Sequence, residues 1–398
     1  LDLSLNQLTG EIPEELGSLT NLTELNLSDN LLTGQLPAEL SDLIEHITSE
    51  GGLYYNQGQE DIGVQLTMDF SNNDLRGKPP LVQGAAFVFL GGNRIDTPSN
   101  NGDREALVAL YDAAGGDGWQ RNANWVSDKP LVDWEGVSVG PNGRVAGLYL
   151  RENGLTGTIP PELGNLSQLR FLDLGQGWSG ELEGEIPPEL GNLKNLIGLS
   201  LHGNRLTGEL PPELGNLANL QTLTLGSNEL TGPIPPELAG LENLETLFLD
   251  DNQLTGPIPP ELADLENLGG LSISRNQLTG RIPAWLGSLE NLHSIGLDGN
   301  RLSGPIPPEL GNAPALTSIF LSDNGLTGEI PPELGNLWLY WLGLSNNQLS
   351  GQVPPELGNS INLSNLMLEG NRLSGCVPRV LQGQLERSDI GSLSFCNP

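Results

Sequence analysis

The segment LQTLTLGSNELTGPIPPELAGL, residues 220–241, decides the fold of this 398-residue chain, because close copies of it follow one another along most of the sequence. Each copy fits the template LxxLxLxxNxLTGxIPPELGNL. The Asn of the template recurs every 24 residues through six copies and then twice more, at Asn204, Asn228, Asn252, Asn276, Asn300, Asn324, Asn347 and Asn371. A fixed period of about 20 to 50 residues is typical of solenoids in which each repeat forms one coil.

Elementary chemistry assigns a role to each part of the template. The LxL unit predicts a short strand whose leucines point into the coil, with parallel strands of successive coils about 4.8 Å apart. The Asn amide can donate to and accept from backbone groups of the turn, so we expect a buried Asn ladder rather than a ligand site. Because Pro lacks the N–H that an interior strand needs, PPEL predicts a short helical turn on the convex side.

The template resembles a leucine-rich repeat, and its LTGxIP segment is similar to the plant-type subclass of receptor-kinase ectodomains, receptor-like proteins and polygalacturonase-inhibiting proteins. The resemblance covers about four fifths of the chain. It implies an α/β repeat solenoid, a curved right-handed superhelix with a parallel β-sheet on the concave face and short helical turns on the convex face.

Breaks in the repeat divide the chain into four predicted segments. Residues 1–99 form the C-terminal part of a first array, which is irregular at 44–66 and joined to the rest by a linker over 97–102. Residues 100–144 form the N-terminal cap of a second array, residues 145–375 form its ten coils, and residues 376–398 form its C-terminal cap. The alternative is one long array in which residues 101–143 are an insertion.

The N-terminal cap combines a helix with a Trp-rich segment. Residues 103–114 (DREALVALYDAA) predict an amphipathic helix with Asp103 as its N-cap. The segment WEGV that begins at Trp134 resembles the cap of plant-type repeat proteins. The cysteines of that cap would fall at Val132 and Val139, so we expect aliphatic packing in place of a disulfide.

The C-terminal tail and two irregular coils depart from the template. Cys376 and Cys396 bracket a tail that resembles the C-terminal cap of the same proteins, which implies a disulfide and an oxidising compartment. Three extra residues between Leu174 and Leu182 place Trp178 on a bulge. One residue is missing at 337–339, so we expect the geometry of that coil to differ.

Charge and motif content exclude several classes of function. The 17 Lys and Arg against 50 Asp and Glu leave a net charge of −33, which repels nucleic acid and anionic membranes. The three histidines lie far apart, and the sequence contains no metal-binding motif, no nucleophile elbow, no phosphate-binding loop and no kinase signature. We therefore expect no cofactor and no enzyme activity. A kinase domain, if there is one, would lie outside this chain. The Glu of each PPEL is expected to form a solvated file on the convex side.

The concave face is where the sequence stops repeating. Side chains beside the strand leucines point outward there, and aromatic residues with Arg are typical of interaction hot spots, although unselected surface variation is the alternative. The candidate ligand-binding residues are Tyr149, Arg151, Arg170, Phe171, Asp173, Phe248, Asp250, Phe320, Tyr340 and Trp341, of which the last three are expected to form one apolar patch. Sequons, which imply glycosylation of a secreted eukaryotic protein, occur at Asn21, Asn26, Asn165 and Asn362.

The resemblance leads to three hypotheses for function. The first is a non-catalytic recognition scaffold, extracellular or at the cell surface, that binds a protein, peptide or glycan on its concave face without direct membrane contact by this segment. The second is a polygalacturonase-inhibitor-like protein, against which the acidity of the chain speaks. The third is ice binding, because Thr recurs in the LTG segments; Ser303, Ser350 and Ser374 interrupt this ladder.

Overall fold

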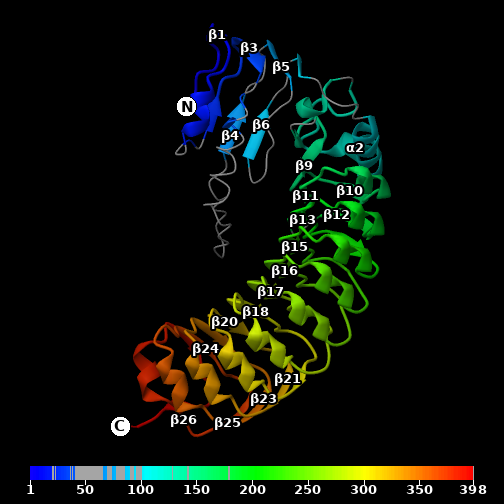
Figure 1. Cartoon of the computed structure of the whole chain (residues 1–398). Coiled ribbons are helices and arrows are strands. Elements are labelled where there is room, and N and C mark those ends of the chain that lie inside the picture. Colours follow the sequence, from blue (N-terminus) through cyan, green and yellow to red (C-terminus); the bar gives the residue numbers. More distant parts are fainter. Residues whose placement is uncertain are drawn as a thin grey trace.

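The computed structural model describes residues 1–40 except 20, 21, 23, 36 and 38, four short strands between 66 and 95, and residues 101–397 except 128, 141, 142, 178 and 179. The chain forms a curved solenoid whose strands line the inner side of the arc and whose short helical turns line the outer side (Figure 1). The predicted class, a leucine-rich solenoid with a parallel sheet and short turns, is confirmed.

One twelve-stranded sheet forms the concave face of the second array. Its strands are parallel except for β8 and β9, which pair antiparallel in the cap. In spatial order they are β8 (Val137–Val139), β9 (Val145–Tyr149), β11 (Phe171–Asp173), β13 (Gly198–Ser200), β15 (Thr222–Thr224), β16 (Thr246–Phe248), β17 (Gly270–Ser272), β18 (Ser294–Gly296), β20 (Ser318–Phe320), β22 (Trp341–Gly343), β24 (Asn365–Met367) and β27 (Arg387–Asp389).

The LTG segments form smaller sheets on a side face. Their strands are β10 (Thr156–Thr158), β12 (Glu181–Glu185), β14 (Arg205–Thr207), β19 (Ser303–Gly304), β21 (Gly325–Gly328), β23 (Gln348–Gln352) and β25 (Arg372–Ser374). The Thr or Ser of successive LTG segments forms a ladder along this side face. Several of its hydroxyls donate to the Gly carbonyl of the preceding coil, as Thr231 does to Gly208 over 3.2 Å and Ser303 to Gly280 over 3.3 Å. The repeated Thr therefore helps to tie neighbouring coils together.

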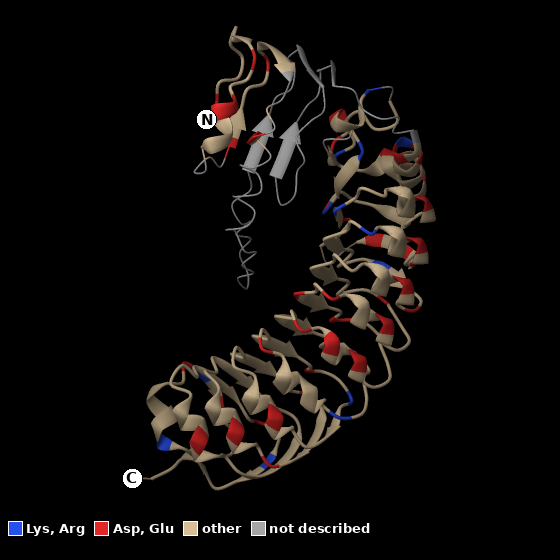
Figure 2. Cartoon of the chain, viewed as in Figure 1, with Lys and Arg blue, Asp and Glu red and all other residues tan. Residues whose placement is uncertain are grey.

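The PPEL segments form 3-10 turns on the convex side, as predicted. They are η4 (Pro161–Asn165), η5 (Pro188–Asn192), η6 (Pro212–Asn216), η7 (Pro236–Gly240), η8 (Pro260–Asp264), η9 (Ala284–Ser288), η10 (Pro308–Asn312), η11 (Pro332–Asn336) and η12 (Pro355–Asn359). Their Glu side chains are exposed and mark the outer side of the arc (Figure 2). Trp285, which interrupts this file, is half-buried and packs against the core.

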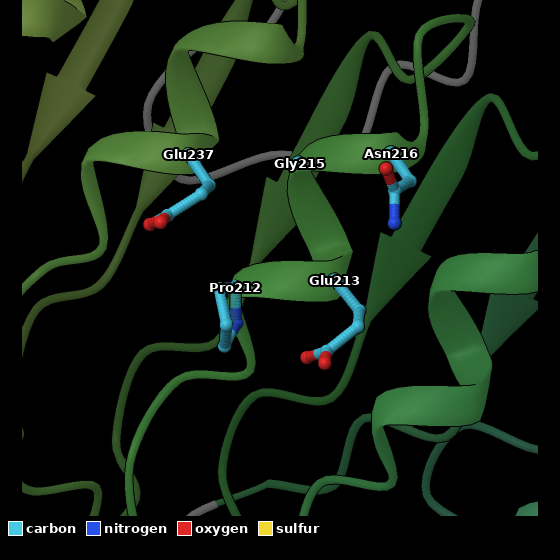
Figure 3. Close-up of a pocket in the computed structure, with 5 residues that line it drawn as sticks. All are labelled: Pro212, Glu213, Gly215, Asn216 and Glu237. Atoms are coloured by element: carbon cyan, nitrogen blue, oxygen red, sulfur yellow. The ribbon is translucent and has the colours of Figure 1, made fainter.

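An open depression lies between two of these turns. It is lined by Pro212, Glu213, Gly215, Asn216 and Glu237, and the two carboxylates project from neighbouring coils (Figure 3). A Cβ on Gly215 would overlap the carbonyl of Glu237, so this glycine permits the close approach of the two coils. The depression follows from coil stacking.

Leucine burial and an Asn ladder hold the coils together. The strand leucines are fully buried; Leu225 and Leu249, for example, are 0% exposed. Asn252 donates to the carbonyls of Leu225 and Leu249 over 3.1 and 3.2 Å, and its Oδ1 accepts from the N–H of Leu230 at 3.0 Å. The predicted Asn ladder is therefore confirmed, and it joins each coil to both neighbours.

A second Asn ladder, absent from the expectations, lies on the surface. The Asn that follows each of the turns η5 to η9 donates to a backbone carbonyl of the preceding coil, as Asn243 does to Ala218 over 2.8 Å and Asn267 to Glu242 over 2.9 Å. These side chains are exposed, so the bond contributes less than its buried counterpart.

The strands of the first array pair only with one another. They are β1 (Thr9–Gly10), β2 (Glu24–Asn26), β3 (Leu31–Gln35), β4 (Leu66–Asp69), β5 (Asp74–Gly77), β6 (Ala86–Phe89) and β7 (Arg94–Ile95), in two sheets ordered β2-β4-β6 and β1-β3-β5-β7, with a 3-10 turn at η1 (Glu14–Ser18). Asn30 extends the Asn ladder here by accepting from the N–H of Leu8. Most of the irregular segment 44–66 and most of the linker lie outside the described residues.

The helix of the N-terminal cap, α2 (Asn101–Ala113), begins earlier than predicted, so the assignment of Asp103 as N-cap is wrong. Asp103 lies in the first turn and is 1% exposed. Its carboxylate accepts from Arg144 Nε at 2.8 Å and Nη2 at 2.5 Å, and from the N–H of Val145 at 2.8 Å. This buried, paired carboxylate fastens the helix to β9.

Aromatic rings and aliphatic side chains together fill the N-terminal cap, where Leu107 and Leu110 are buried beside the indoles. Ring centroids are 4.9 Å apart for Trp119 and Trp125, and 5.2 Å apart for Trp125 and Trp134. Val139 packs at the edge of the core, whereas Val132 is half-buried and does not belong to it. The expected aliphatic packing in place of a disulfide is therefore corrected in part: Val139 contacts the core and Val132 does not, and indoles in edge-to-face and tilted contact fill much of the end of the solenoid through their large apolar area.

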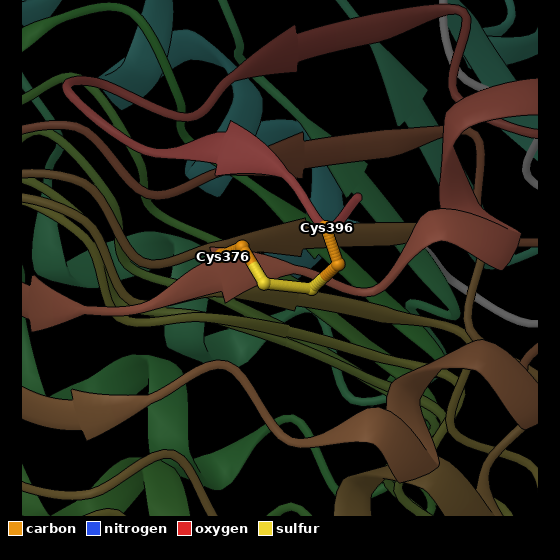
Figure 4. The surroundings of a disulfide bond; sticks show 2 residues. All are labelled: Cys376 and Cys396. Carbon is orange, nitrogen blue, oxygen red and sulfur yellow. A yellow bond between two sulfur atoms is a disulfide. The ribbon is translucent and has the colours of Figure 1, made fainter. Parts of the chain in front are cut away.

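The C-terminal cap contains the predicted disulfide. Cys376 and Cys396 are bonded across a sequence separation of 20 (Figure 4). They lie on or beside β26 (Cys376–Val377) and β28 (Ser394–Phe395), which pair in parallel and flank the turn η13 (Arg379–Gly383).

The two irregular coils behave differently. Trp178 lies outside the described residues. At the one-residue deletion, Leu337 is extended with ψ 155°, whereas the equivalent Leu217 has ψ 61°. The local geometry of this coil therefore differs, as expected, and Trp338 is left 68% exposed.

Candidate functional site

The strand register fixes two outward-facing columns on the concave sheet, on either side of the buried central leucines. The first column runs Gly147, Phe171, Gly198, Thr222, Thr246, Gly270, Ser294, Ser318, Trp341, Asn365 and Arg387. The second column runs Tyr149, Asp173, Ser200, Thr224, Phe248, Ser272, Gly296, Phe320, Gly343, Met367 and Asp389. Neighbours in a column lie about one strand spacing, roughly 4.8 Å, apart.

The first two coils bring together an aromatic and basic group. The rings of Tyr149 and Phe171 stack with centroids 6.3 Å apart, and the guanidinium carbon of Arg170 lies 5.9 Å from the Phe171 ring. Burial raises the pKa of Tyr149 and lowers the pKa of Arg170. Asp173 is the register partner of Tyr149, so these four residues form one surface.

Two further residues border this group. Arg151 is exposed at the end of the first strand, with its Nε 3.9 Å from Glu152 Oε1. His202, which was not among the predicted residues, lies 2.9 Å from Ser200 Oγ through its Nδ1. Burial, assisted by the charge of Arg151, lowers the pKa of His202, so the imidazole is neutral at physiological pH.

The middle of the sheet carries Phe248 above an acidic edge. A Cβ at Gly270 would lie 3.4 Å from Phe248 Cε1, so the ring rests over a position that has no side chain. Asp250 follows the same strand, and its pKa is raised by burial, although the hydrogen bond from Ser272 acts in the opposite direction. Asp298 lies two coils further on and accepts from Ser274 Oγ at 2.5 Å.

The later coils unite two of the three aromatic residues that were expected to form a patch. Phe320 and Trp341 have ring centroids 5.5 Å apart. Phe320 is flanked in its column by Gly296 and Gly343, which leaves room for both rings above the sheet. Tyr340 is 52% exposed on the approach to β22, and it forms no ring contact with either residue.

Glycines accompany the concave aromatics repeatedly. Phe171 lies over Gly198, where a Cβ would be 3.2 Å from its ring, and Phe248 lies over Gly270 in the same way. An aromatic ring beside a strand glycine covers backbone that would otherwise be exposed. These rings are therefore half-buried platforms held beside strand glycines by the sheet.

Between β13 and β24, neither outward column contains an Asp, Glu, Lys or Arg. We call this surface the neutral strip; it consists of the outward residues of these eight strands. Within the described chain, the hydroxyls of Thr222, Thr246, Ser294 and Ser318, all in the first column, form no hydrogen bond to the protein. In a chain of net charge −33, such a surface requires that the carboxylates lie elsewhere. Aligning the repeats on their LxL units could have identified it from sequence.

The sequons differ in their surroundings. Asn165 and Asn362 are exposed, whereas Asn26 is half-buried and its Oδ1 accepts from both the N–H and the Oγ of Ser28. Asn21 lies outside the described residues. The amide oxygen of Asn26 therefore supports the local turn, whereas the exposed Asn165 and Asn362 form no such bond within the described part of the chain.

Two kinds of site are absent from the described residues. They contain no group of three or more His, Cys, Asp or Glu that could hold a metal ion. None of the helices in this part of the chain combines the length and apolarity required to cross a bilayer.

Comparison with known proteins agrees with this architecture. The family described as leucine-rich repeat region matches residues 148–296, and the leucine-rich repeat family matches 1–19, 21–43, 291–313, 315–337 and 338–360. Phytosulfokine receptor 2 of Arabidopsis thaliana is 33% identical over 93 residues, which span 23% of this chain and 9% of the receptor.

Two solved structures are similar over most of the chain. A plant ice-binding protein is 30% identical, with a TM-score of 0.64 over 75% of this chain and 98% of that protein. The Arabidopsis receptor kinase HAESA, solved with the peptide hormone IDA and the co-receptor SERK1, is 30% identical, with a TM-score of 0.60 over 97% of this chain and 60% of that one. The repeats, the sheet and these matches together show that the chain belongs to the leucine-rich repeat family.

Proposed function

We propose that this chain is a non-catalytic recognition scaffold that binds an extended ligand along its concave face. The observation that carries the proposal is the set of half-buried aromatic platforms, Phe248 and Phe320 in the second column and Trp341 in the first, on strands whose inward side chains already fill the core. Aromatic rings held rigidly on a concave surface provide contact area at little entropic cost. The structure of HAESA with its peptide hormone supports ligand binding by this kind of solenoid.

An extracellular or cell-surface location accompanies this proposal. The disulfide between Cys376 and Cys396 is stable in an oxidising compartment. The likeness to receptor ectodomains favours the same location.

The division into two arrays at residues 99 and 100 also remains our proposal, and the separate pairing of the strands on either side supports it.

Ice binding is the second candidate, because the plant ice-binding protein matches over nearly its whole length. The side-face ladder exposes Thr255 and Thr279 in regular succession. Glu183 interrupts the ladder, and hydroxyls such as that of Thr231 are engaged with backbone carbonyls. These features favour a structural role for the ladder, and a thermal-hysteresis measurement separates the two functions.

Panning of the chain against a random peptide library and a glycan array tests the recognition proposal. The double variant Phe320→Ala/Trp341→Ala is expected to lose about tenfold or more in affinity for any ligand so found. The matched control, Glu237→Gln/Glu261→Gln, changes two exposed convex residues and is expected to bind as the parent does. Binding that survives the concave variant but not the convex one would overturn the proposal, as would a failure of both libraries to yield a ligand.

A further inference from the structure

We propose that the ligand of the neutral strip is an uncharged oligosaccharide, a β-linked glucan chain that lies across the strands from β13 to β24. This inference rests on the proposed recognition function and names the ligand class. Three properties of the strip carry it: its lack of charge, its aromatic platforms and its unpaired hydroxyls.

The distribution of charge selects against ionic ligands. An anionic chain would be repelled by a protein of net charge −33, and a cationic chain would find carboxylates only at the edge of the strip, at Asp250 and Asp298, and none within its two columns. The other acidic residues include the exposed Glu of the convex turns (Figure 2). A neutral ligand is the class whose burial on this strip leaves no ionic group unpaired.

The aromatic platforms suit pyranose rings. The rings of Phe320 and Trp341 pack 5.5 Å apart at one end of the strip, and Phe248 lies three strands away, at about 14 Å by the strand spacing. The broad face of a β-linked glucose unit is covered with C–H groups, which pack on the face of an aromatic ring. The sheet holds each ring over or beside glycine, so the platforms are formed before the ligand arrives.

The hydroxyl column supplies hydrogen bonds of the required kind. Thr222, Thr246, Ser294 and Ser318 each offer a hydroxyl that both donates and accepts, as sugar hydroxyls do. At the edge of the strip, the carboxylates of Asp250 and Asp298 can accept from sugar hydroxyls. A β-1,4-linked glucan extends as a ribbon whose rise per sugar is close to the spacing of parallel strands, so successive sugars meet successive coils, whereas a β-1,3-linked glucan curves.

Calorimetric titration of the whole chain tests this inference with four defined probes. Cellohexaose and laminarihexaose are neutral β-glucans, hexagalacturonate is an anionic oligosaccharide, and hexalysine is a cationic peptide. We expect at least one neutral hexaose to bind, with an affinity that changes less than about twofold between low and high NaCl, because no ion pair contributes. Hexagalacturonate and hexalysine are expected to bind about tenfold more weakly or not at all.

Variants connect the binding to the strip. Trp341→Ala is expected to weaken the neutral hexaose about tenfold, and Trp341→Phe to restore most of the loss because a ring remains. The double variant Thr222→Val/Thr246→Val keeps the shape of both side chains but removes their hydroxyls, and it is expected to lower the affinity for the neutral hexaose as well. The control Trp338→Ala removes an indole that is 68% exposed off the strip, and it should have no effect. Melting temperatures close to that of the parent establish that each variant is folded.

The outcomes separate the inference from the function on which it rests. If hexalysine binds more tightly than either neutral hexaose and its affinity falls as NaCl is added, the strip binds a cationic peptide and the inference is wrong. If hexagalacturonate binds as tightly as the neutral hexaoses, the argument from charge is wrong. If neither neutral hexaose binds at millimolar concentration, the inference is wrong. The recognition function would still stand in each of these cases if the libraries yield a ligand that depends on Phe320 and Trp341.

Discussion

The buried Asn ladder makes a quantitative prediction within a single coil. Asn252 and Asn243 lie on the same repeat, and both donate from Nδ2 to backbone carbonyls of a neighbouring coil. Asn252 is 8% exposed, whereas Asn243 is exposed. The same substitution, Asn→Ala, can therefore be compared at a buried and an exposed rung of one solenoid.

The magnitude follows from the groups left without partners. Asn252→Ala removes the acceptor of the N–H of Leu230, a residue that is 0% exposed, and an orphaned buried donor costs about 1–3 kcal/mol. The carbonyls of Leu225 and Leu249 each keep a second Asn donor, from Asn228 and Asn276, so they lose only part of their bonding. The total is roughly 2–5 kcal/mol when about 0.5–1 kcal/mol is added for each of the two weakened carbonyls. Asn243→Ala loses one exposed bond and should cost about 0.5 kcal/mol.

Equilibrium urea unfolding followed by Trp fluorescence measures both variants, with the shift in midpoint interpreted at constant slope. Hydrogen exchange supplies a local readout, because the amide of Leu230 should lose protection in Asn252→Ala and keep it in Asn243→Ala. Equal destabilisation by the two substitutions, or a protected Leu230 amide in Asn252→Ala, would refute the assignment of the buried ladder as the main polar support of the coils.

Four other predictions concern packing, the disulfide and charge. Trp341→Ala should lower the free energy of unfolding by no more than about 1.5 kcal/mol, whereas Leu344→Ala should lower it by about 2–5 kcal/mol; equal losses in urea unfolding would make the Trp a packing residue. Replacing Cys376 and Cys396 by Ser should cost about 3 kcal/mol, and two free thiols in the non-reduced parent, detected by mass spectrometry, would contradict the disulfide. Added NaCl should raise the melting temperature at pH 7 because it screens repulsion within a chain of net charge −33; an unchanged or lower value would argue against self-repulsion. Asp250→Asn should stabilise the protein at pH 7, because burial raises the pKa of this carboxyl and disfavours its ionised form, and pH-dependent melts should show the gain disappearing as pH falls toward the ordinary value of 3.8.

Local pattern was sufficient wherever the same few residues recur. The LxL unit predicted the strands, PPEL predicted the 3-10 turns, and the recurring Asn predicted the ladder, because in a solenoid each coil contacts only its neighbours and short-range sequence specifies most contacts. The disulfide between Cys376 and Cys396 followed from resemblance to a known cap. The concave position of the candidate residues also followed from the alternation of strand side chains.

The sequence by itself therefore determined the repeat, its core and the face on which the candidate residues lie. Only the tertiary structure decided what those residues form together. Asp103 proved to be the buried partner of Arg144, 41 residues away, and Trp341 proved to pack on Phe320 while the adjacent Tyr340 forms no ring contact with either. The physical reason is that side-chain contacts across neighbouring coils depend on strand register and on which neighbour is a glycine, and both are set by stacking rather than by any single repeat.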